Sequence, residues 1–351
     1  MTVRILDGDV RDRLRDLPDA SVQCCVTSPP YYGLRDYGVP GQIGLEPTLA
    51  EYIANMVAVF REVRRVLRDD GTLWLNIGDS YAAARGGTHQ PAETLAGGKN
   101  GYMPDGKRVN RGRGDTYNPT RDAAKHGLKH KDLMMVPARL ALALQDDGWY
   151  LRSDIIWHKP NPMPESVTDR PTSAHEHIFL LTKSRKYFYD ADAIRTEPTE
   201  ESVARLDRAD LREKPGWMEA FQGNPPARLR RDKQRGHGRR HAGFNDRWDA
   251  MPKDEQQAMG ANARNVWTIA TKPFSEAHFA TFPPEIPERC IKAGSRAGDT
   301  ILDPFLGSGT TLLVADRLGR DGIGIELNPT YAAMARRRIE ADCPMFAEVC
   351  A

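Results

Sequence analysis

The sequence alternates short apolar runs with longer segments in which apolar residues recur at helical spacing. The pattern is clearest near the end of the chain, where residues 300–303 and 322–326 are typical of strands. Helical patterns occupy residues 309–318, between these two strands, and residues 331–339, after the second. Strands and helices that alternate in this way predict an α/β fold with a mostly parallel sheet flanked by helices.

The same alternation runs through the first half of the chain. Strands are predicted at residues 3–6, 21–27, 72–77, 149–157 and 177–182, and helices at residues 10–17, 49–67 and 133–144. A further helix is predicted to begin near Phe282, with prolines in its first turn. With 351 residues, the chain is long enough to bury a large core.

Two polar segments interrupt this alternation. Residues 82–131 are rich in glycine and basic residues, which predicts a flexible insertion in the core. Residues 190–265 are polar and arginine-rich but contain four aromatic residues, which predicts a small ordered module. We therefore expect a core that is interrupted twice.

Basic residues are concentrated in these same segments, although the formal net charge is only +2. Residues 85–131 contain ten Lys or Arg against four Asp or Glu, and residues 228–240 contain seven against one. Such runs could contact a polyanion, and each could equally be a solvated loop.

The composition argues against several classes of protein. The five cysteines show no paired spacing, which predicts a reduced, cytoplasmic protein without a structural metal. The first residues lack the apolar core of a signal peptide, and no apolar stretch approaches the roughly 20 residues of a membrane span. We therefore expect no membrane partner.

A rigid corner follows the apolar run at residues 22–26, where the chain reads Ser28-Pro29-Pro30-Tyr31. Prolines fix the backbone and lack N–H groups, so the carbonyls of this corner can accept hydrogen bonds from a ligand. One hydroxyl and one aromatic ring lie beside them in the sequence. The corner could hold a flat ring that bears an amino group, and on its own it could equally be an ordinary proline turn.

A second corner lies between a strand and a helix near the end of the chain, where Asp303-Pro-Phe-Leu-Gly307-Ser308-Gly309-Thr-Thr places two glycines at a sharp turn. The next strand ends at Glu326, where a carboxylate could hold the hydroxyls of a ribose. This arrangement is typical of a site for a nucleotide-like ligand.

Three kinds of ligand compete for this second corner. A phosphate-binding loop would need a lysine after the last glycine, but Thr310 stands there. A dinucleotide site would need a third glycine, and Leu312 occupies its position, while Asp303 would repel a pyrophosphate. S-adenosylmethionine fits better because it carries cationic groups and a ribose but no phosphate.

With both corners, the chain closely resembles the site-specific DNA methyltransferases that methylate the exocyclic amino group of cytosine (N4) or adenine (N6). The order of the two corners resembles the beta arrangement, in which the catalytic half comes first. The resemblance implies a Rossmann-like fold, S-adenosylmethionine as the methyl donor, and catalysis by Ser28, Pro29, Pro30 and Tyr31. It assigns the donor site to Asp9, Phe282, Asp303, Phe305, Gly307, Ser308, Gly309, Thr310 and Glu326.

The resemblance also implies an organisation along the chain. Residues 1–81 and 132–189 would form the catalytic half, residues 82–131 a flexible basic insertion, residues 190–265 the target-recognition region, and residues 266–351 the donor-binding half. Double-stranded DNA is the implied partner, and a cognate restriction endonuclease could accompany the enzyme. The predicted DNA contacts are Arg35, Arg228, Arg230, Arg231, Lys233 and Arg235.

The expected chemistry begins with a base flipped out of the duplex, at a cost of a few kcal/mol. Stacking on Tyr31 would offset roughly 1–3 kcal/mol of that cost, while Ser28 and the Pro29 carbonyl would accept the amino hydrogens. Methylation at carbon 5 would need a Pro-Cys nucleophile, which the sequence lacks. In the family a serine in the first position of the corner goes mostly with cytosine, so N4 of cytosine is favoured and N6 of adenine stays open.

Two alternatives from other classes remain at this level. The chain could be a DNA-binding protein that has kept the donor site but not the catalysis. It could also carry out the same amino methylation on RNA. The two basic runs favour a nucleic acid over a protein as the acceptor.

Overall fold

The computed structural model describes residues 1–34, 36, 38–83, 123–197, 250–252, 255, 260–272, 282–342 and 348–350. The chain divides into two compact units. The first combines Met1–Asp190 with Arg264–Ala351, and the second is Ala191–Ala263. The aromatic residues of the predicted ordered module and most of both basic runs lie outside the described residues.

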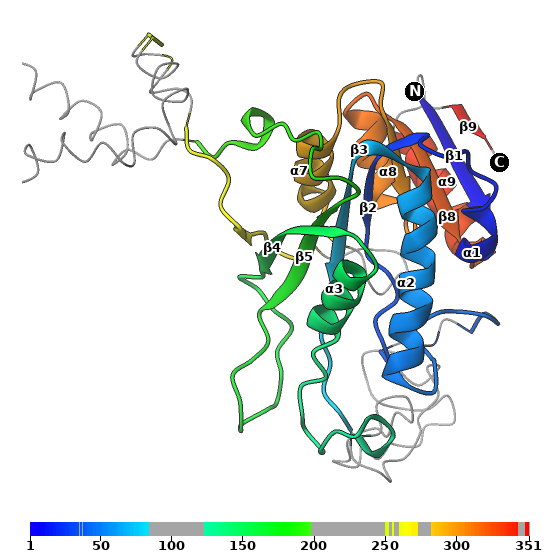
Figure 1. Cartoon of the computed structure of the whole chain (residues 1–351), viewed down its shortest axis with the longest axis vertical. Helices are drawn as coiled ribbons and strands as arrows, with labels where there is room; N and C mark the ends of the chain where they lie inside the picture. The colour runs from blue at the N-terminus through cyan, green and yellow to red at the C-terminus, as the bar shows by residue number, and fades with distance from the viewer. Residues whose placement is uncertain are drawn as a thin grey trace, which may run out of the picture. The chain divides into compact units, whose positions relative to one another are not determined.

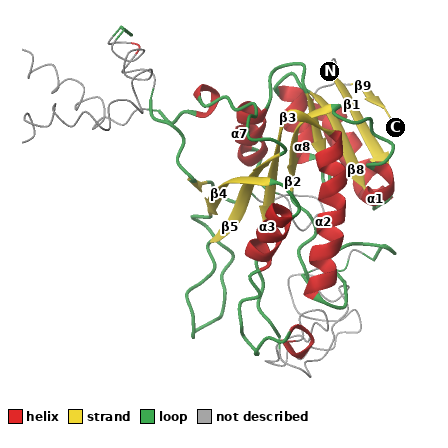
Figure 2. Ribbon diagram, in the orientation of Figure 1, coloured by secondary structure: helices red, strands yellow, loops and turns green. Residues whose placement is uncertain are grey.

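The first unit is built on a nine-stranded sheet with the order β6-β4-β5-β3-β2-β7-β8-β1-β9. Figure 2 shows its strands in yellow and the helices beside them in red. The strands are β1 (Thr2–Asp7), β2 (Val22–Thr27), β3 (Leu67–Ile77), β4 (Tyr150–His158), β5 (His175–Thr182), β6 (Val266–Thr268), β7 (Thr300–Asp303), β8 (Asp321–Glu326) and β9 (Glu348–Cys350). Six of the eight strand pairings are parallel. The predicted α/β fold with a mostly parallel sheet is confirmed.

β5 runs antiparallel to both of its neighbours, β3 and β4. The sequence pattern did not predict the short strands β6 and β9, nor this antiparallel direction. β5 runs antiparallel to β4 because the connection between them contains no helix. A parallel neighbour needs a long crossover, whereas a chain that turns back directly pairs antiparallel.

Helices cover both faces of the sheet. They are α1 (Val10–Arg13), α2 (Leu49–Val66), α3 (Val136–Asp146), α7 (Glu285–Gly294), α8 (Thr310–Arg317) and α9 (Pro329–Asp342). The first unit also contains the short 3₁₀ helix η3 (Ala123–His126), and the second unit contains the 3₁₀ helix η4 (Asp192–Ile194). α2 packs against α3, and α7 packs against α8 (Figure 1). No helix among the described residues is long and apolar enough to cross a membrane.

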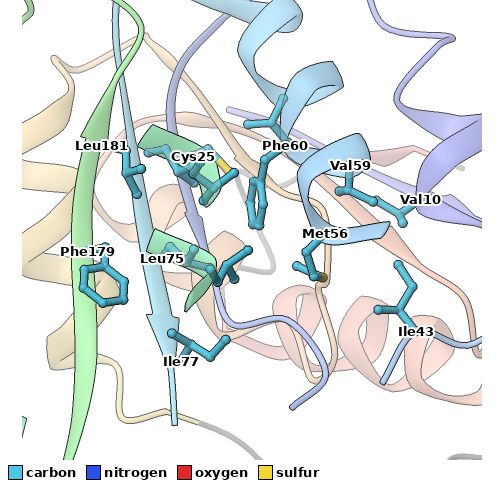
Figure 3. Packing of buried hydrophobic residues seen from close by; sticks show 14 of the residues in the cluster. Val10, Cys25, Ile43, Met56, Val59, Phe60, Leu75, Ile77, Phe179 and Leu181 are labelled. Carbon is cyan, nitrogen blue, oxygen red and sulfur yellow. The ribbon is translucent and has the colours of Figure 1, made fainter. Parts of the chain in front are cut away.

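Alternate residues of the central strands face the two helical layers. Cys25 and Leu75 belong to a buried cluster with Met56 and Phe60 of α2 (Figure 3). On the opposite face, α7 approaches so closely that a Cβ on Gly294 would lie within 3 Å of the side chains of Cys24, Thr72 and Trp74. Both adjacent cysteines are therefore buried core residues.

α2 illustrates why the sequence forms these elements. Thr48 and Glu51 form a capping box at its start, in which each side chain accepts a hydrogen bond from the other residue's backbone N–H. Its buried residues recur at helical spacing, and the helix ends at Val66. β3 then begins at once with Leu67, which pairs with Val22, so this strand is longer than predicted.

The sheet topology positions the candidate site. β1, β2, β7 and β8 run in the same direction, so their carboxyl ends meet at one edge of the sheet. The Ser28 corner follows β2 and the Asp303 corner follows β7, its immediate neighbour. Ligands of open α/β sheets bind at this edge.

Candidate active site

Both predicted corners line one cleft at the carboxyl edge of the sheet. The cleft encloses about 1120 Å³ of empty space, part of which is open to solvent. The Ser28, Pro29, Pro30 and Tyr31 corner lies on one side, and the predicted donor residues Asp9, Phe282, Asp303, Phe305, Gly307, Ser308, Thr310 and Glu326 also line it. The loop after Tyr31 adds Leu34, Val39, Gly41, Gln42 and Ile43.

Asp303 ends β7 and is almost fully buried, with 2% of its surface exposed. Thr27 donates a hydrogen bond to its Oδ1 at 2.7 Å, and Thr311 donates to its Oδ2 at 2.6 Å. The backbone N–H of Phe305 adds a third bond. Burial raises the pKa of Asp303 to about 6, although the two hydroxyl donors oppose this shift. The carboxylate is thus held rigidly by its own chain.

Glu326 is the last residue of β8, and backbone N–H groups hold its carboxylate in position. Gly307 N–H donates to its Oε2 and Asn328 N–H donates to its Oε1, both at 2.8 Å. Burial raises the pKa of this carboxyl, and the two backbone donors lower it. A carboxylate has about four lone-pair positions, so two backbone bonds leave room for a ligand's hydroxyls.

Gly307 and Gly309, the two glycines of the donor corner, have different structural roles. Gly307 lines the cleft with φ +54°, a conformation in which glycine is favoured. Gly309, with φ +82°, is absent from the lining. A Cβ added there would lie 2.9 Å from the Cβ of Ala335 in α9, so Gly309 permits close packing of that helix.

Arg338 of α9 supports the same corner from behind. Its guanidinium donates to the Ser308 carbonyl and hydroxyl and to the Thr310 hydroxyl, at 2.9–3.1 Å. The sequence pattern did not predict this contact, because Arg338 lies about thirty residues after Ser308 and Thr310 in the chain.

Asp9 lies in the cleft lining and caps α1 through the backbone N–H of Arg11. The Arg11 guanidinium forms an ion pair with the same carboxylate and also bonds the Gly41 carbonyl. The bond with Arg11 holds the pKa of Asp9 below its usual value. Asp9 is therefore both the N-cap of α1 and a residue of the cleft lining.

The Ser28 corner is fixed by hydrogen bonds to α2 and β5 and by one within the corner itself. Tyr52 of α2 donates to the Pro30 carbonyl at 3.0 Å. The Tyr31 hydroxyl donates to Glu176 of β5 at 2.6 Å, and Ser28 Oγ donates to the Tyr31 oxygen at 3.4 Å. Among the described residues the Pro29 carbonyl accepts no hydrogen bond. It remains available to a ligand.

Three residues behind this corner were not among the predicted site residues. Asn76 Nδ2 lies 3.3 Å from Ser28 Oγ and 3.0 Å from both the Tyr31 oxygen and Glu176 Oε2. Lys159 forms an ion pair with the other oxygen of Glu176. In the sequence they are marked only by an asparagine in β3, a Lys-Pro-Asn pattern directly after β4 and a His-Glu-His pattern in β5.

His177, the residue after Glu176 in β5, contacts Asp154 at 2.9 Å and is absent from the cleft lining. The predicted DNA contacts Arg35, Arg228, Arg230, Arg231, Lys233 and Arg235 lie outside the described residues. Within the described part of the chain, no cluster of three or more His, Cys, Asp or Glu could hold a metal ion.

Comparison with proteins of similar sequence identifies the family. A family model described as DNA methylase, covering N6 and N4 enzymes, matches residues 22–337. The type II methyltransferase M.XycI of Xanthomonas campestris pv. cyanopsidis is 44% identical over 96% of this chain and 87% of its own length. M.SmaI of Serratia marcescens is 43% identical over 96% of this chain and 90% of its own length.

Comparison with solved structures supports the Rossmann-like fold. A Thermus thermophilus protein crystallised with S-adenosyl-L-methionine superposes with a TM-score of 0.53 and 24% identity, over 99% of this chain and all of its own. The cytosine-N4-specific PvuII DNA methyltransferase gives a TM-score of 0.55 and 17% identity, over 97% of this chain and 92% of its own. The family match over residues 22–337, together with relatives above 40% identity, shows that the chain belongs to the N6/N4 DNA methylase family.

Proposed function

We propose that this protein methylates the exocyclic N4 of a cytosine flipped out of duplex DNA, with S-adenosylmethionine as the donor. One observation carries the proposal: the Ser28 corner and the corner from Asp303 to Thr310 line the same cleft. An acceptor held at the first corner would lie beside a ligand held at the second. Holding two reactants side by side in this way can account for much of an enzyme's acceleration of a direct group transfer.

The second corner suits the donor's chemistry. Glu326 offers acceptor positions for ribose hydroxyls, and Asp303 supplies an acid beside a cationic ligand. Phe282 and Phe305 add apolar surface, and Gly307 lets the ligand approach the backbone. When bound, S-adenosylmethionine supplies an electrophilic methyl group on a sulfonium. Asp9 is assigned to the same donor site.

The first corner suits an aromatic amine. Tyr31 provides a ring for stacking, and Ser28 Oγ and the Pro29 carbonyl can accept the two amino hydrogens. Accepting both hydrogens increases electron density on a nitrogen whose lone pair is otherwise delocalised into the ring. No covalent bond between the protein and the base is needed, and the chain contains no Pro-Cys nucleophile.

Ser28 supports cytosine as the target, because serine in the first position of this corner goes mostly with cytosine in the family. Adenine N6 is the second candidate for the same site. A DNA-binding protein without catalysis and a methyltransferase that acts on RNA are the remaining alternatives.

Recognition of the DNA sequence is assigned to residues 190–265, most of which fall within the second compact unit. The basic residues Arg228, Arg230, Arg231, Lys233 and Arg235, together with Arg35, are proposed to contact the DNA. Residues 1–81 and 132–189 would present the base, residues 266–351 would hold the donor, and residues 82–131 would form a basic insertion. The type II names of the relatives favour a cognate restriction endonuclease as a genetic partner.

A transfer assay with tritiated S-adenosylmethionine tests the proposal. Label should enter unmethylated duplex DNA and should be absent from RNA of the same sequence composition. Ser28→Ala should bind the donor as the wild type does, as measured by calorimetry, and should transfer label at least 100-fold more slowly. Donor binding without transfer by the wild-type protein would favour the non-catalytic alternative.

A further inference from the structure

A chain of hydrogen-bonded polar side chains extends from the Ser28 corner to residues behind the cleft lining. It runs from Ser28 to the Tyr31 hydroxyl and on to Glu176, with separations of 3.4 Å and 2.6 Å. Asn76 contacts all three residues. Glu176 and Asn76 line no part of the cleft, so they can affect a ligand only through Tyr31 and Ser28.

The direction of these hydrogen bonds is set by Glu176. An ionised carboxylate can only accept, so the phenol of Tyr31 must donate its hydrogen to Glu176. Burial and the neighbouring Glu176 raise the pKa of Tyr31, so the phenol keeps this hydrogen. The amide of Asn76 is oriented by the same rule, because its Nδ2 and not its oxygen faces Glu176.

The Tyr31 oxygen can therefore only accept from its remaining neighbours, Ser28 and Asn76. The Ser28 hydroxyl directs its own hydrogen to Tyr31. Asn76 Nδ2 lies 3.3 Å from the Ser28 oxygen, but its two hydrogens have nearer acceptors in Tyr31 and Glu176, both at 3.0 Å. A hydroxyl oxygen has two lone pairs, so at least one remains for a ligand. Ser28 then presents an acceptor and not a hydrogen to the cleft.

Glu176 is itself held in place. Lys159, which follows β4, forms an ion pair with its second oxygen. The ammonium group also lies 4.4 Å from the centre of the Trp157 ring. The side chains of Lys159 and Glu176 are only 19% and 15% exposed, so solvent competes weakly with this pair.

We propose that Glu176 is a positioning residue that fixes the polarity of the Ser28 hydroxyl through Tyr31, so that serine accepts a hydrogen from the amino group of the target base. A serine hydroxyl can donate or accept, whereas a carboxylate in its place could only accept. This role rests on the proposed function, because it concerns how the same corner holds an amine.

A double-mutant cycle of Glu176→Gln and Tyr31→Phe tests this role. Phenylalanine keeps the ring and removes only the hydroxyl that links Glu176 to Ser28. The single-turnover rate of tritiated methyl transfer to duplex DNA should fall about 10-fold in each single variant, as expected for a hydrogen bond to a charged group. The double variant should fall about as far as the slower single variant, and not about 100-fold.

Two further measurements separate positioning from general damage. The Kd for S-adenosylmethionine should stay within about twofold of wild type in all three variants, because Glu176 and Tyr31 lie on the acceptor side. Glu165→Gln is the matched control: Glu165 also forms an ion pair, with Arg170, but contacts neither Tyr31 nor Ser28. It should transfer methyl groups at the wild-type rate.

Several outcomes would overturn the role. A wild-type rate in Glu176→Gln, multiplicative losses in the double variant, or a loss of donor affinity as large as the loss of rate would each do so. If Glu176→Gln does not fold, Glu176→Asp retains the charge, shortens the arm and should show the same coupling to Tyr31→Phe. If the wild-type protein transfers no label to DNA, the proposed function fails; if only the coupling is missing, only the role of Glu176 fails.

Discussion

The hydroxyl of Thr27 donates a 2.7 Å hydrogen bond to the carboxylate of Asp303, a residue 276 positions further along the chain. Thr27 is the last residue of β2, directly before Ser28, and Asp303 is the last residue of β7, the adjacent strand. Both side chains are buried. This bond joins the two corners of the cleft at their bases.

Replacing Thr27 by valine should therefore disturb both stability and donor binding. Valine preserves the shape but leaves the buried carboxylate with one donor fewer. We expect the free energy of unfolding to fall by about 1–3 kcal/mol, the cost of an unsatisfied bond to a buried charged group. Urea titration measures this loss, and Thr300→Val on the same strand as Asp303, away from its carboxylate, should change the free energy of unfolding by less than about 0.5 kcal/mol.

The stability of the protein should depend on pH through Asp303. Its pKa is raised from 3.8 to about 6, so the folded state holds this proton more tightly than the unfolded state. Asp303 therefore lowers the free energy of unfolding as pH rises from about 4 to 6. The shift corresponds to at most about 3 kcal/mol.

Urea titrations of the wild type and Asp303→Asn across this range would detect the effect. The wild type should lose stability relative to the variant as pH rises, with most of the change complete above pH 6. Parallel stability profiles for the two proteins would show that Asp303 titrates normally in the folded state.

Glu326→Gln should weaken donor binding without unfolding the protein. Two backbone N–H groups point at this carboxylate. A glutamine can satisfy one of them with its oxygen but turns an N–H toward the other. We expect the Kd for S-adenosylmethionine, measured by calorimetry, to rise at least 10-fold. Glu340→Gln, an exposed change on α9, should leave the Kd unchanged; an equal Kd for Glu326→Gln would argue against its assignment to the donor.

Two glycine substitutions should separate the corners functionally. A Cβ on Gly78 would lie 2.7 Å from the ring of Tyr31. Gly78→Ala should therefore displace the ring and slow methyl transfer at least 10-fold with little change in donor Kd. Gly309→Ala should instead raise the Kd for the donor, because strain at φ +82° and contact with Ala335 disturb the donor corner. Identical profiles for both variants would contradict the division of the cleft.

Local sequence patterns predicted most of the fold. β7 matches its predicted range, and β8 and α8 start within one residue of theirs, because apolar runs and turn residues mark them strongly. The antiparallel direction of β5 was not predicted, since it depends on a missing crossover helix and not on the strand's own residues.

The sequence motifs identified the two corners that line the cleft, but not the side chains that lie behind them. The residues of both corners that line the cleft lie within short motifs, and these could be read from the sequence. Asn76, Lys159 and Glu176 come from three different segments and meet only after the sheet has formed. Gly309 was assigned to the donor by its motif, whereas its contact with α9 depends on a residue 26 positions away, Ala335.

The most direct test of the proposed function is mass spectrometry of nucleosides from the DNA of methylation-deficient bacteria that express the protein. The proposal predicts N4-methylcytosine with the wild type and none with Ser28→Ala, at equal expression of the two proteins. N6-methyladenine in place of N4-methylcytosine would contradict the assigned base, and N4-methylcytosine that persists in Ser28→Ala would contradict the assigned corner.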